Sequence, residues 1–319
     1  MPTTDPSVPQ TRGDRAGRTR HPQAILKGIS TPWTEDYELD QDAFVRHTVR
    51  MLDHGYRHLY VFGTAGEGHA VGDAAYRRVV DVFADLMAPD DHHPQVGVIT
   101  LSLDHAAERI AYALDRGVTT FQIVLPSWGV MSQDDKVRFF VALCRRFPEA
   151  DFLHYNYPQA RNMMAPEDYA VVIGEVPNLV ATKTSTMDMA FIRGLMCQAG
   201  ELQHFFLQGP FPYGCSYGEC SLISSLAPVF PRTSMELFEA GQRGDLETAF
   251  RLQRRLMEVG SGLYAGVDKP HIDGAYDKLT SWLVDPAFPR RLLPPSESLS
   301  DEAAGIAREY YLTACSDLS

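Results

Sequence analysis

The sequence predicts a single (β/α)₈ barrel followed by a C-terminal helical extension. Eight short apolar runs recur along the chain, with amphipathic stretches between most of them. Buried strands that alternate with helices indicate a parallel sheet with right-handed crossovers, and eight units at roughly 30-residue spacing indicate a closed barrel. An open doubly wound sheet is the competing architecture. The runs are residues 24–30, 58–63, 95–100, 120–126, 151–156, 179–183, 204–209 and 220–225.

Two of the intervening stretches show why helices are expected between the strands. Residues 42–55 place apolar side chains close to a 3.6-residue period and end at Gly55. Residues 104–117 follow the same pattern and end at Gly117. Glycine commonly follows the last turn of a helix because it adopts the left-handed conformation there. These stretches therefore predict helices that end shortly before the next strand.

Three segments divide the chain. Residues 1–23 are rich in Pro, Thr and Arg and have no hydrophobic period, so they are predicted to be a disordered tail. Residues 24–233 hold the eight strand and helix units and form the predicted barrel. Residues 234–319 are helical in pattern beyond what eight strands need, and they form the predicted extension.

Composition excludes several classes of protein. The chain has 319 residues, 45% of them hydrophobic and 22% charged, with a formal net charge of -12. The acidic balance argues against nucleic acid as a partner, since binding to a phosphate backbone needs a basic surface. The chain contains neither an apolar run long enough for a membrane helix nor a CxxC pair, so we expect a cytoplasmic protein with no membrane partner and no metal.

Lys183 is the most informative residue of the chain. It ends the apolar run 179–183, where the carboxyl ends of barrel strands carry active-site groups. A desolvated amine has a lowered pKa, which makes the neutral form available to attack a carbonyl and form a Schiff base. From position alone, a lysine turned to bulk water is the competing interpretation.

Two residues from other strands favour the catalytic interpretation. Tyr155 lies near the end of the preceding run, and its phenol would be able to shuttle the protons that Schiff-base chemistry requires. Thr64 follows the second run within FGTAGEG, and its hydroxyl is suited to orient that phenol. We expect the backbone N–H groups of this turn, from Gly63 to Ala65, to hold a small carboxylate.

The combination resembles the dihydrodipicolinate synthase and N-acetylneuraminate lyase family. The motifs are GTAGEG after the second run, YNYP in the fifth, and a lysine 28 residues after the first tyrosine of YNYP. GISTPW near residue 30 and GECSLISSLAPVFP around the eighth run add support. The resemblance implies a barrel on which Lys183 forms the Schiff base, Tyr155 relays protons and Thr64 positions Tyr155. It also implies no dissociable cofactor and a homo-oligomer, a dimer of dimers.

Substrate contacts are expected at Gly63, Ala65 and Ser224, with Trp128 and Arg161 as further candidates. Ala65 replaces the family's second hydroxyl residue, which removes one contact to the carboxylate. Trp128 stands where synthases carry a tyrosine, and it is similar to the tryptophan of hydratase-aldolases. The family's arginine aligns with the position before Arg161, so a shift of one residue is needed to assign that role to Arg161.

These observations predict a lyase that joins or cleaves a 2-oxo acid and an aldehyde or other electrophile. A dehydratase or hydratase-aldolase acting on a sugar acid or an aryl-substituted 2-oxo acid is an alternative within enzymes. A barrel that only senses a 2-oxo acid is the alternative outside them, and the changes at Ala65 and Trp128 motivate it.

Overall fold

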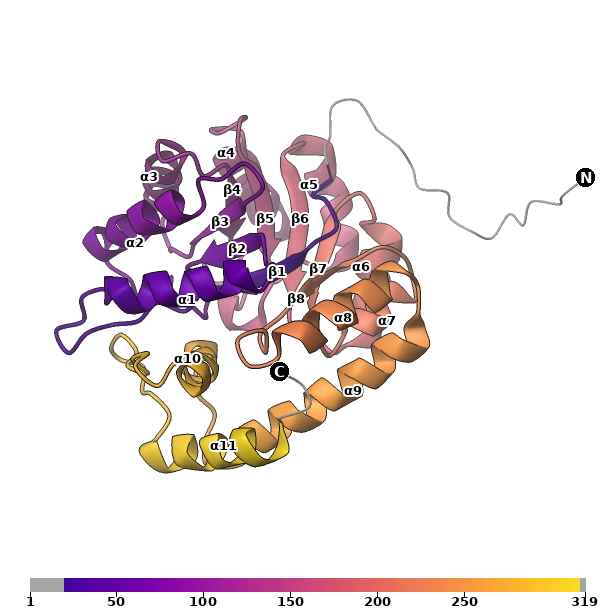
Figure 1. Cartoon of the computed structure of the whole chain (residues 1–319). Coiled ribbons are helices and arrows are strands. Elements are labelled where there is room, and N and C mark those ends of the chain that lie inside the picture. Colours follow the sequence, from indigo (N-terminus) through magenta and orange to yellow (C-terminus); the bar gives the residue numbers. More distant parts are fainter. Residues whose placement is uncertain (1–19, 316–319) are drawn as a thin grey trace, which may run out of the picture.

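The computed structural model describes residues 20–315 and contains a closed barrel of eight parallel strands in sequential order, which confirms the predicted fold (Figure 1). Each strand pairs with its neighbours in the chain, and β1 closes the barrel by pairing with β8. All eight apolar runs became strands. The strands are β1 Ile25–Gly28, β2 His58–Val61, β3 His93–Val98, β4 Thr120–Ile123, β5 Asp151–Tyr155, β6 Leu179–Thr184, β7 Gln203–Leu207 and β8 Ser221–Ile223.

Helices connect the strands and cover the outside of the barrel (Figure 1). The two predicted helix ends are found, since Gly55 and Gly117 follow α1 and α3 with φ of 88° and 85°. Local caps set several helix starts; for example, Ser102 accepts a hydrogen bond at the start of α3. The helices are α1 Gln41–Asp53, α2 Asp73–Leu86, α3 Leu103–Leu114, α4 Gln133–Cys144, α5 Tyr169–Glu175, α6 Met189–Gln198, α7 Phe211–Cys215 and α8 Pro231–Gln242, with short 3₁₀ turns η1 Pro158–Ala160 and η2 Pro166–Asp168.

The C-terminal extension comprises α9 Leu246–Leu263, α10 Asp273–Val284 and α11 Asp301–Ala314. Helix α8 runs across the boundary that the sequence places between residues 233 and 234, because it is the helix that follows β8 and belongs to the barrel. Gly244, with φ of 69°, separates α8 from α9 within a stretch that reads as continuously helical. The extension therefore begins about a dozen residues later than predicted.

The segment before β1 is packed against the barrel from Arg20 onward, so the predicted tail boundary at residue 23 is too late. The guanidinium of Arg20 donates hydrogen bonds to the carbonyls of Leu202 and Glu219, and the backbone N–H of His21 donates to Val180. These contacts anchor Arg20 and His21 to the start of β6 and to the loops that precede β7 and β8. The rest of the predicted tail, residues 1–19, lies outside the described residues.

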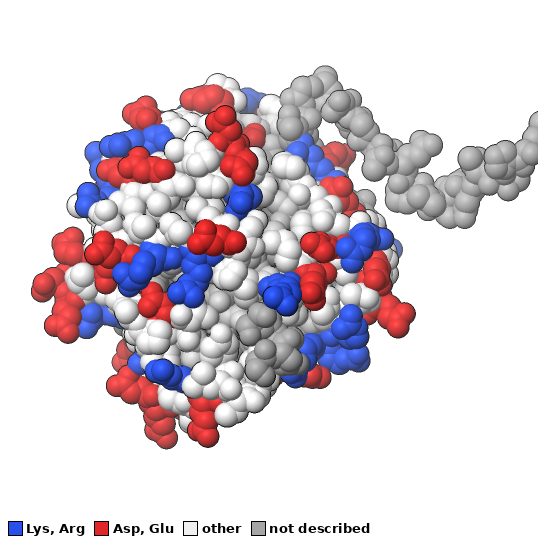
Figure 2. Space-filling model, in the orientation of Figure 1, with Lys and Arg blue, Asp and Glu red and all other residues white. Residues whose placement is uncertain are grey.

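Apolar packing forms two layers. One layer lies between the sheet and the helices, and a smaller cluster fills the barrel interior with side chains such as Leu26, Leu153, Ala181 and Phe205. On the outer surface, acidic and basic side chains are interspersed over the face in Figure 2. That face offers no continuous basic tract of the kind that a nucleic-acid backbone needs. None of the helices among residues 20–315 combines the length and apolarity needed to span a bilayer.

Candidate active site

Lys183 and Tyr155 lie side by side at the carboxyl ends of neighbouring strands. They are register partners in the β5 and β6 pair, so their side chains leave the sheet on the same face, into the barrel. Lys183 is 3% exposed and Tyr155 is 6% exposed. The structure thus removes the alternative in which Lys183 is turned to bulk water.

The amino group of Lys183 lies between two aromatic rings. Its Nζ is 3.9 Å from the ring centroid of Tyr60 and 4.0 Å from that of Tyr155, and it donates a 3.1 Å hydrogen bond to Oε1 of Gln122. Burial lowers the pKa of Lys183 to about 7, while Asp273 and Asp277 act in the opposite direction. A large fraction of the amine is therefore neutral and nucleophilic near neutral pH.

Tyr60 occupies its place because two glycines leave room for it. A Cβ atom at Gly28 or at Gly63 would come within 2.6 Å of the Tyr60 ring. A Cβ at Gly63 would also lie 3.3 Å from Nζ of Lys183. Gly63, predicted as a substrate contact, thus keeps the space beside the amine open and admits the ring that lines it.

Thr64 and Tyr155 contact each other as the sequence analysis predicts. The Thr64 hydroxyl is 3.2 Å from the Tyr155 hydroxyl, across the barrel between the loop after β2 and the end of β5. Burial raises the pKa of Tyr155 well above its ordinary value, with the nearby phenol of Tyr60 acting in the same direction. Tyr155 therefore stays protonated near neutral pH and is available as a proton donor.

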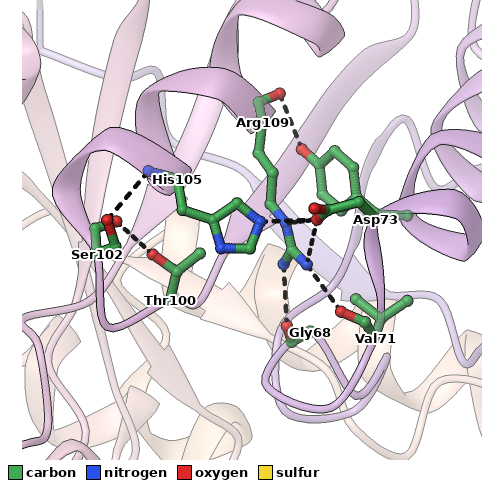
Figure 3. A network of polar contacts seen from close by, with 8 residues as sticks. Gly68, Val71, Asp73, Thr100, Ser102, His105 and Arg109 are labelled. Carbon is green, nitrogen blue, oxygen red and sulfur yellow. Dashed lines mark hydrogen bonds and ion pairs between the residues drawn. The ribbon is translucent and has the colours of Figure 1, made fainter.

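A buried arginine supports the loop that carries Thr64. Figure 3 shows Arg109, from α3, pointing into this loop and toward Asp73 at the start of α2. Its guanidinium donates to the carbonyl of Val71 at 2.7 Å and to Asp73 at 3.0 Å, and it reaches the carbonyl of Gly68 at 3.4 Å. His105 donates a further 2.7 Å bond to Asp73. These bonds hold residues 68–73 against α3.

A second anchor of the same loop comes from the extension. Glu67 has a φ of 57° and is 1% exposed, and its carboxylate accepts hydrogen bonds from Nε1 of Trp33 at 2.9 Å and from the backbone N–H of Leu293 at 2.5 Å. Lys278 of α10, fully buried, forms an ion pair with it. Glu67 is thus a structural residue that fastens the loop after β2 to α10.

An inner cavity of about 210 Å³ opens beside Lys183. Ala65 and Ser224, both predicted substrate contacts, line it together with Lys183 and Tyr155. Helix α10 contributes two carboxylates one turn apart, Asp273 and Asp277. A second lysine, a further serine and several tyrosines complete this part of the wall, namely Lys27, Ser225, Tyr60, Tyr157, Tyr264 and Tyr276.

The α10 carboxylates and Lys27 place further titratable groups on the wall of the inner cavity. Asp273 accepts hydrogen bonds of 2.8 and 3.0 Å from the hydroxyl of Tyr157. Burial raises the pKa of Asp277 to about 6, and the neighbouring Lys27 opposes that shift. Burial also lowers the pKa of Lys27, with Asp277 opposing it. Two lysines and two aspartates, counting Lys183, therefore line the cavity, and burial favours the neutral forms of all four.

An outer cavity of about 390 Å³ is lined by Thr64 and shares Tyr155 and Tyr157 with the inner cavity. The rings of Tyr155 and Tyr157 stack with centroids 5.1 Å apart, and both cavities reach this pair. The loops after β3, β4 and β5 supply most of the remaining wall, including Leu101, Ser127 and Ala160. A buried amine with a lowered pKa, an adjacent protonated phenol and two adjacent cavities are the elements of an aldolase site.

Comparison with known proteins places the chain in a family. The sequence model described as the Dihydrodipicolinate synthetase family matches residues 21–277. The chain belongs to this family. Members of the dihydrodipicolinate synthetase family are lyases and aldolases, and this chain is an enzyme of that class.

The related family members are distant in sequence. The 4-hydroxy-tetrahydrodipicolinate synthase of Phenylobacterium zucineum is 25% identical over 291 residues, which cover 90% of this chain and 97% of the relative. An enzyme of the same name from Thermus thermophilus is 26% identical over 240 residues, covering 74% and 79%. Identities this low leave the substrate of this dihydrodipicolinate synthetase family member open.

Solved structures show the same fold. YagE, a prophage protein of the dihydrodipicolinic acid synthase family from E. coli K12 in complex with pyruvate, superposes with a TM-score of 0.82 at 17% identity, covering 91% of this chain and 97% of that one. The wild-type sialic acid aldolase of Ruminococcus gnavus superposes with a TM-score of 0.81 at 18% identity, covering 91% and 96%.

Two residues that we expected to contact substrate lie outside both cavities in the single chain of this family member. Trp128 is 85% exposed, in the loop that turns at Gly129, where φ is 84°. Arg161 has a φ of 64° at the end of η1, which carries its side chain to the exposed side, and Ala160 takes the position on the cavity wall. In the single chain, Ala160 and not Arg161 therefore lines the outer cavity.

Several residues of the site were not predicted from the sequence. Lys27 and Gln122 interrupt apolar runs, and a polar side chain within a buried strand was an available signal for both. Tyr60 lies at an inward position of β2, but an aromatic residue there is also typical of a barrel core, so it was not singled out. Asp273 and Asp277 gave no local signal, because acidic residues four apart are common on exposed helices.

Proposed function

We propose that this enzyme is a class I aldolase in which Lys183 forms an imine with pyruvate or a related 2-oxo acid. It then makes or breaks a carbon–carbon bond to an aldehyde or another electrophile. The observation that carries the proposal is the buried amino group of Lys183, held between Tyr60 and Tyr155 at the wall of the inner cavity. Family membership supports the same chemistry.

The side chains supply each proton and electron pair that imine formation needs. The lone pair of neutral Lys183 attacks the ketone carbon, and a proton moves from the attacking nitrogen to the ketone oxygen to give a hydroxyl group. A second proton, from an acid, lets this group leave as water and leaves the iminium. Tyr155 is the donor within reach, and Thr64 orients its hydroxyl. The iminium then withdraws electrons from the adjacent carbon, which stabilises the carbanion equivalent formed when a proton or a carbon substituent departs.

The two cavities support a division of the substrates. The inner one, at about 210 Å³, suits a small 2-oxo acid beside Lys183, with Ala65 and Ser224 on its wall. The outer one, at about 390 Å³, leaves room for the electrophile, and the two meet at Tyr155 and Tyr157. A proton donor at the junction can serve both bond-forming steps.

Reductive trapping tests the proposal. Incubation with pyruvate and sodium cyanoborohydride is expected to add one reduced pyruvyl group, which tryptic mass mapping locates on Lys183. The reductant delivers hydride to the C=N bond and leaves a stable secondary amine. Lys183→Ala is expected to give no adduct at this site. An unmodified wild-type protein, or an equal adduct on Lys183→Ala, would refute the imine.

The pH dependence of Lys183 reactivity provides a second test. In the pyruvate-free protein, competitive labelling with acetic anhydride is expected to modify Lys183 with a midpoint near pH 7, because only the neutral amine reacts and its pKa is lowered to about 7. Reactivity rises with pH through that midpoint. Exposed Lys269, whose pKa is raised by Glu297, is the internal control and reacts fully only at much higher pH. A Lys183 midpoint above pH 9 would contradict the assignment.

We also propose that the enzyme assembles into a homo-oligomer, a dimer of dimers, in the cytoplasm. Two large apolar side chains, Trp128 and Val130, are 85% and 98% exposed on the loop after β4, and burial against a second copy would stabilise them.

A further inference from the structure

A chain of hydrogen bonds runs from Lys183 down through the barrel interior. Nζ of Lys183 donates to Oε1 of Gln122 at 3.1 Å, and Nε2 of Gln122 donates to Oε1 of Gln95 at 3.0 Å. Nε2 of Gln95 lies 3.3 Å from Nε2 of His21, and Nδ1 of His21 lies 2.8 Å from the carbonyl oxygen of Pro22. The chain thus links the catalytic end of the barrel to the segment that closes its other end.

The position of this chain is unusual for a barrel. Interiors of such barrels are filled mainly by branched apolar side chains, yet β3 and β4 present Gln95 and Gln122, each 1% exposed. Burying an amide without partners costs free energy, and here each amide both donates and accepts within the chain. Gln203 of β7 shows the contrast: it donates to Ser221 at 2.6 Å, but its Oε1 has no partner among the described residues.

The acceptor at the far end sets the direction of every bond. A backbone carbonyl only accepts, so Nδ1 of His21 carries the hydrogen that points to Pro22. Burial lowers the pKa of His21 and keeps the ring neutral, so its Nε2 accepts from Gln95. Gln95 then presents its oxygen to Gln122, and Gln122 presents its oxygen to Lys183.

We propose that Gln122, oriented by Gln95 and His21, is a positioning residue for Lys183. One N–H of the amine is directed down toward Gln122, while the rings of Tyr60 and Tyr155 flank Nζ, so the lone pair of the neutral amine is aimed at the inner cavity. The inference deepens the proposed function and rests on it for its catalytic meaning. The hydrogen-bond chain itself does not depend on the substrate.

The titratable groups around Lys183 show what the hydrogen bond to Gln122 adds to the environment of its amine. Lys183 faces Asp273 and Asp277 from α10 and Lys27 from β1, together with the phenols of Tyr60 and Tyr155. None of these groups accepts a hydrogen bond from Nζ, whereas the oxygen of Gln122 does. A hydrogen-bond acceptor favours the charged ammonium, so removing it is expected to lower the pKa of Lys183 further.

Titratable groups also surround His21, at the other end of the hydrogen-bond chain. The His21 ring lies 5.6 Å from that of His58, between centroids, and the exposed His93 acts on it electrostatically. Arg20 precedes it in the chain. His58 and His93 stack with centroids 4.2 Å apart. Burial lowers the pKa of His21, and the neighbouring His93 acts in the same direction, which keeps the acceptor at Nε2 available to Gln95.

The test compares Gln122→Met with Gln203→Met, a matched change at a buried glutamine that does not reach Lys183. Competitive acetic anhydride labelling of Lys183 in the pyruvate-free protein is expected to shift its midpoint down by about one pH unit in Gln122→Met and to leave it unchanged in Gln203→Met. Gln122→Glu, which places a carboxylate at the same position, is expected to shift the midpoint up. Opposite shifts from the two variants at residue 122 are not expected from a purely structural role.

Gln95→Met completes the test. This variant keeps Gln122 but removes the acceptor that fixes the Gln122 amide, so that amide is free to flip and exchange the positions of its oxygen and nitrogen. We expect the Lys183 midpoint of this variant to differ from wild type by several tenths of a pH unit. If the Lys183 midpoints of Gln122→Met and Gln95→Met both equal that of wild type, the proposed positioning role of Gln122 is refuted, even if cyanoborohydride traps pyruvate on Lys183. Absence of trapping in wild type would instead refute the proposed function, while the labelling midpoints still test whether the hydrogen-bond chain sets the pKa of Lys183.

Discussion

Tyr155→Phe is expected to slow enzyme-catalysed exchange of the pyruvate methyl protons in D₂O by about 10²- to 10⁴-fold, the usual effect of removing a general acid or base. The phenol of Tyr155 lies adjacent to Lys183 and in contact with Thr64, and burial keeps its pKa well above the ordinary value. Phenylalanine keeps the ring that packs over Nζ and removes only the hydroxyl bonded to Thr64. Proton NMR of pyruvate follows the exchange and needs no second substrate.

Tyr169→Phe is the matched control for this change. Tyr169 is fully buried, and its hydroxyl is 2.7 Å from Nδ1 of His154, on the outer face of β5 away from the cavities. We expect its exchange rate to stay close to that of wild type. Exchange by Tyr155→Phe within threefold of wild type would remove Tyr155 from the proton transfer, and equal losses in both variants would indicate a general effect on the fold.

Lys278→Met is expected to destabilise the enzyme by about 3–5 kcal/mol, seen as a fall in Tm of about 5–15 °C. The change leaves the carboxylate of Glu67 buried without its charged partner, and this penalty exceeds the net value of the pair itself. Burial lowers the pKa of Lys278 to about 8, so the lysine is charged at pH 7. Thermal unfolding at pH 7 followed by circular dichroism measures the effect.

Two comparisons separate this effect from the loss of any lysine. Lys269→Met breaks an exposed ion pair with Glu297, whose nitrogen and oxygen are 2.6 Å apart, and we expect it to leave Tm nearly unchanged. The double variant with Glu67→Gln and Lys278→Met leaves no unpaired buried charge and is expected to be more stable than Lys278→Met alone. A Tm for Lys278→Met equal to that of wild type would show that the buried pair does not hold the loop to α10.

The sequence by itself determined the barrel and the centre of its site. Apolar runs and helical periods depend on residues close together in the chain. The eight strands, and the two glycines that follow helix ends, could therefore be predicted in order. Lys183 and Tyr155 end adjacent runs, and a parallel sheet brings such ends together, which places both at one edge. Thr64 followed from the same rule applied to the second strand.

The tertiary structure alone decided what surrounds that centre. Asp273 and Asp277 come from a helix beyond the barrel, and Lys278 meets Glu67 across 211 positions of the chain. Gln122, Gln95 and His21 form one hydrogen-bond chain only because barrel closure points their side chains into the same interior. Periodicity indicates which face of an element is buried, but the partner that each buried polar group meets depends on how distant elements pack, and here those partners set the pKa and orientation of Lys183.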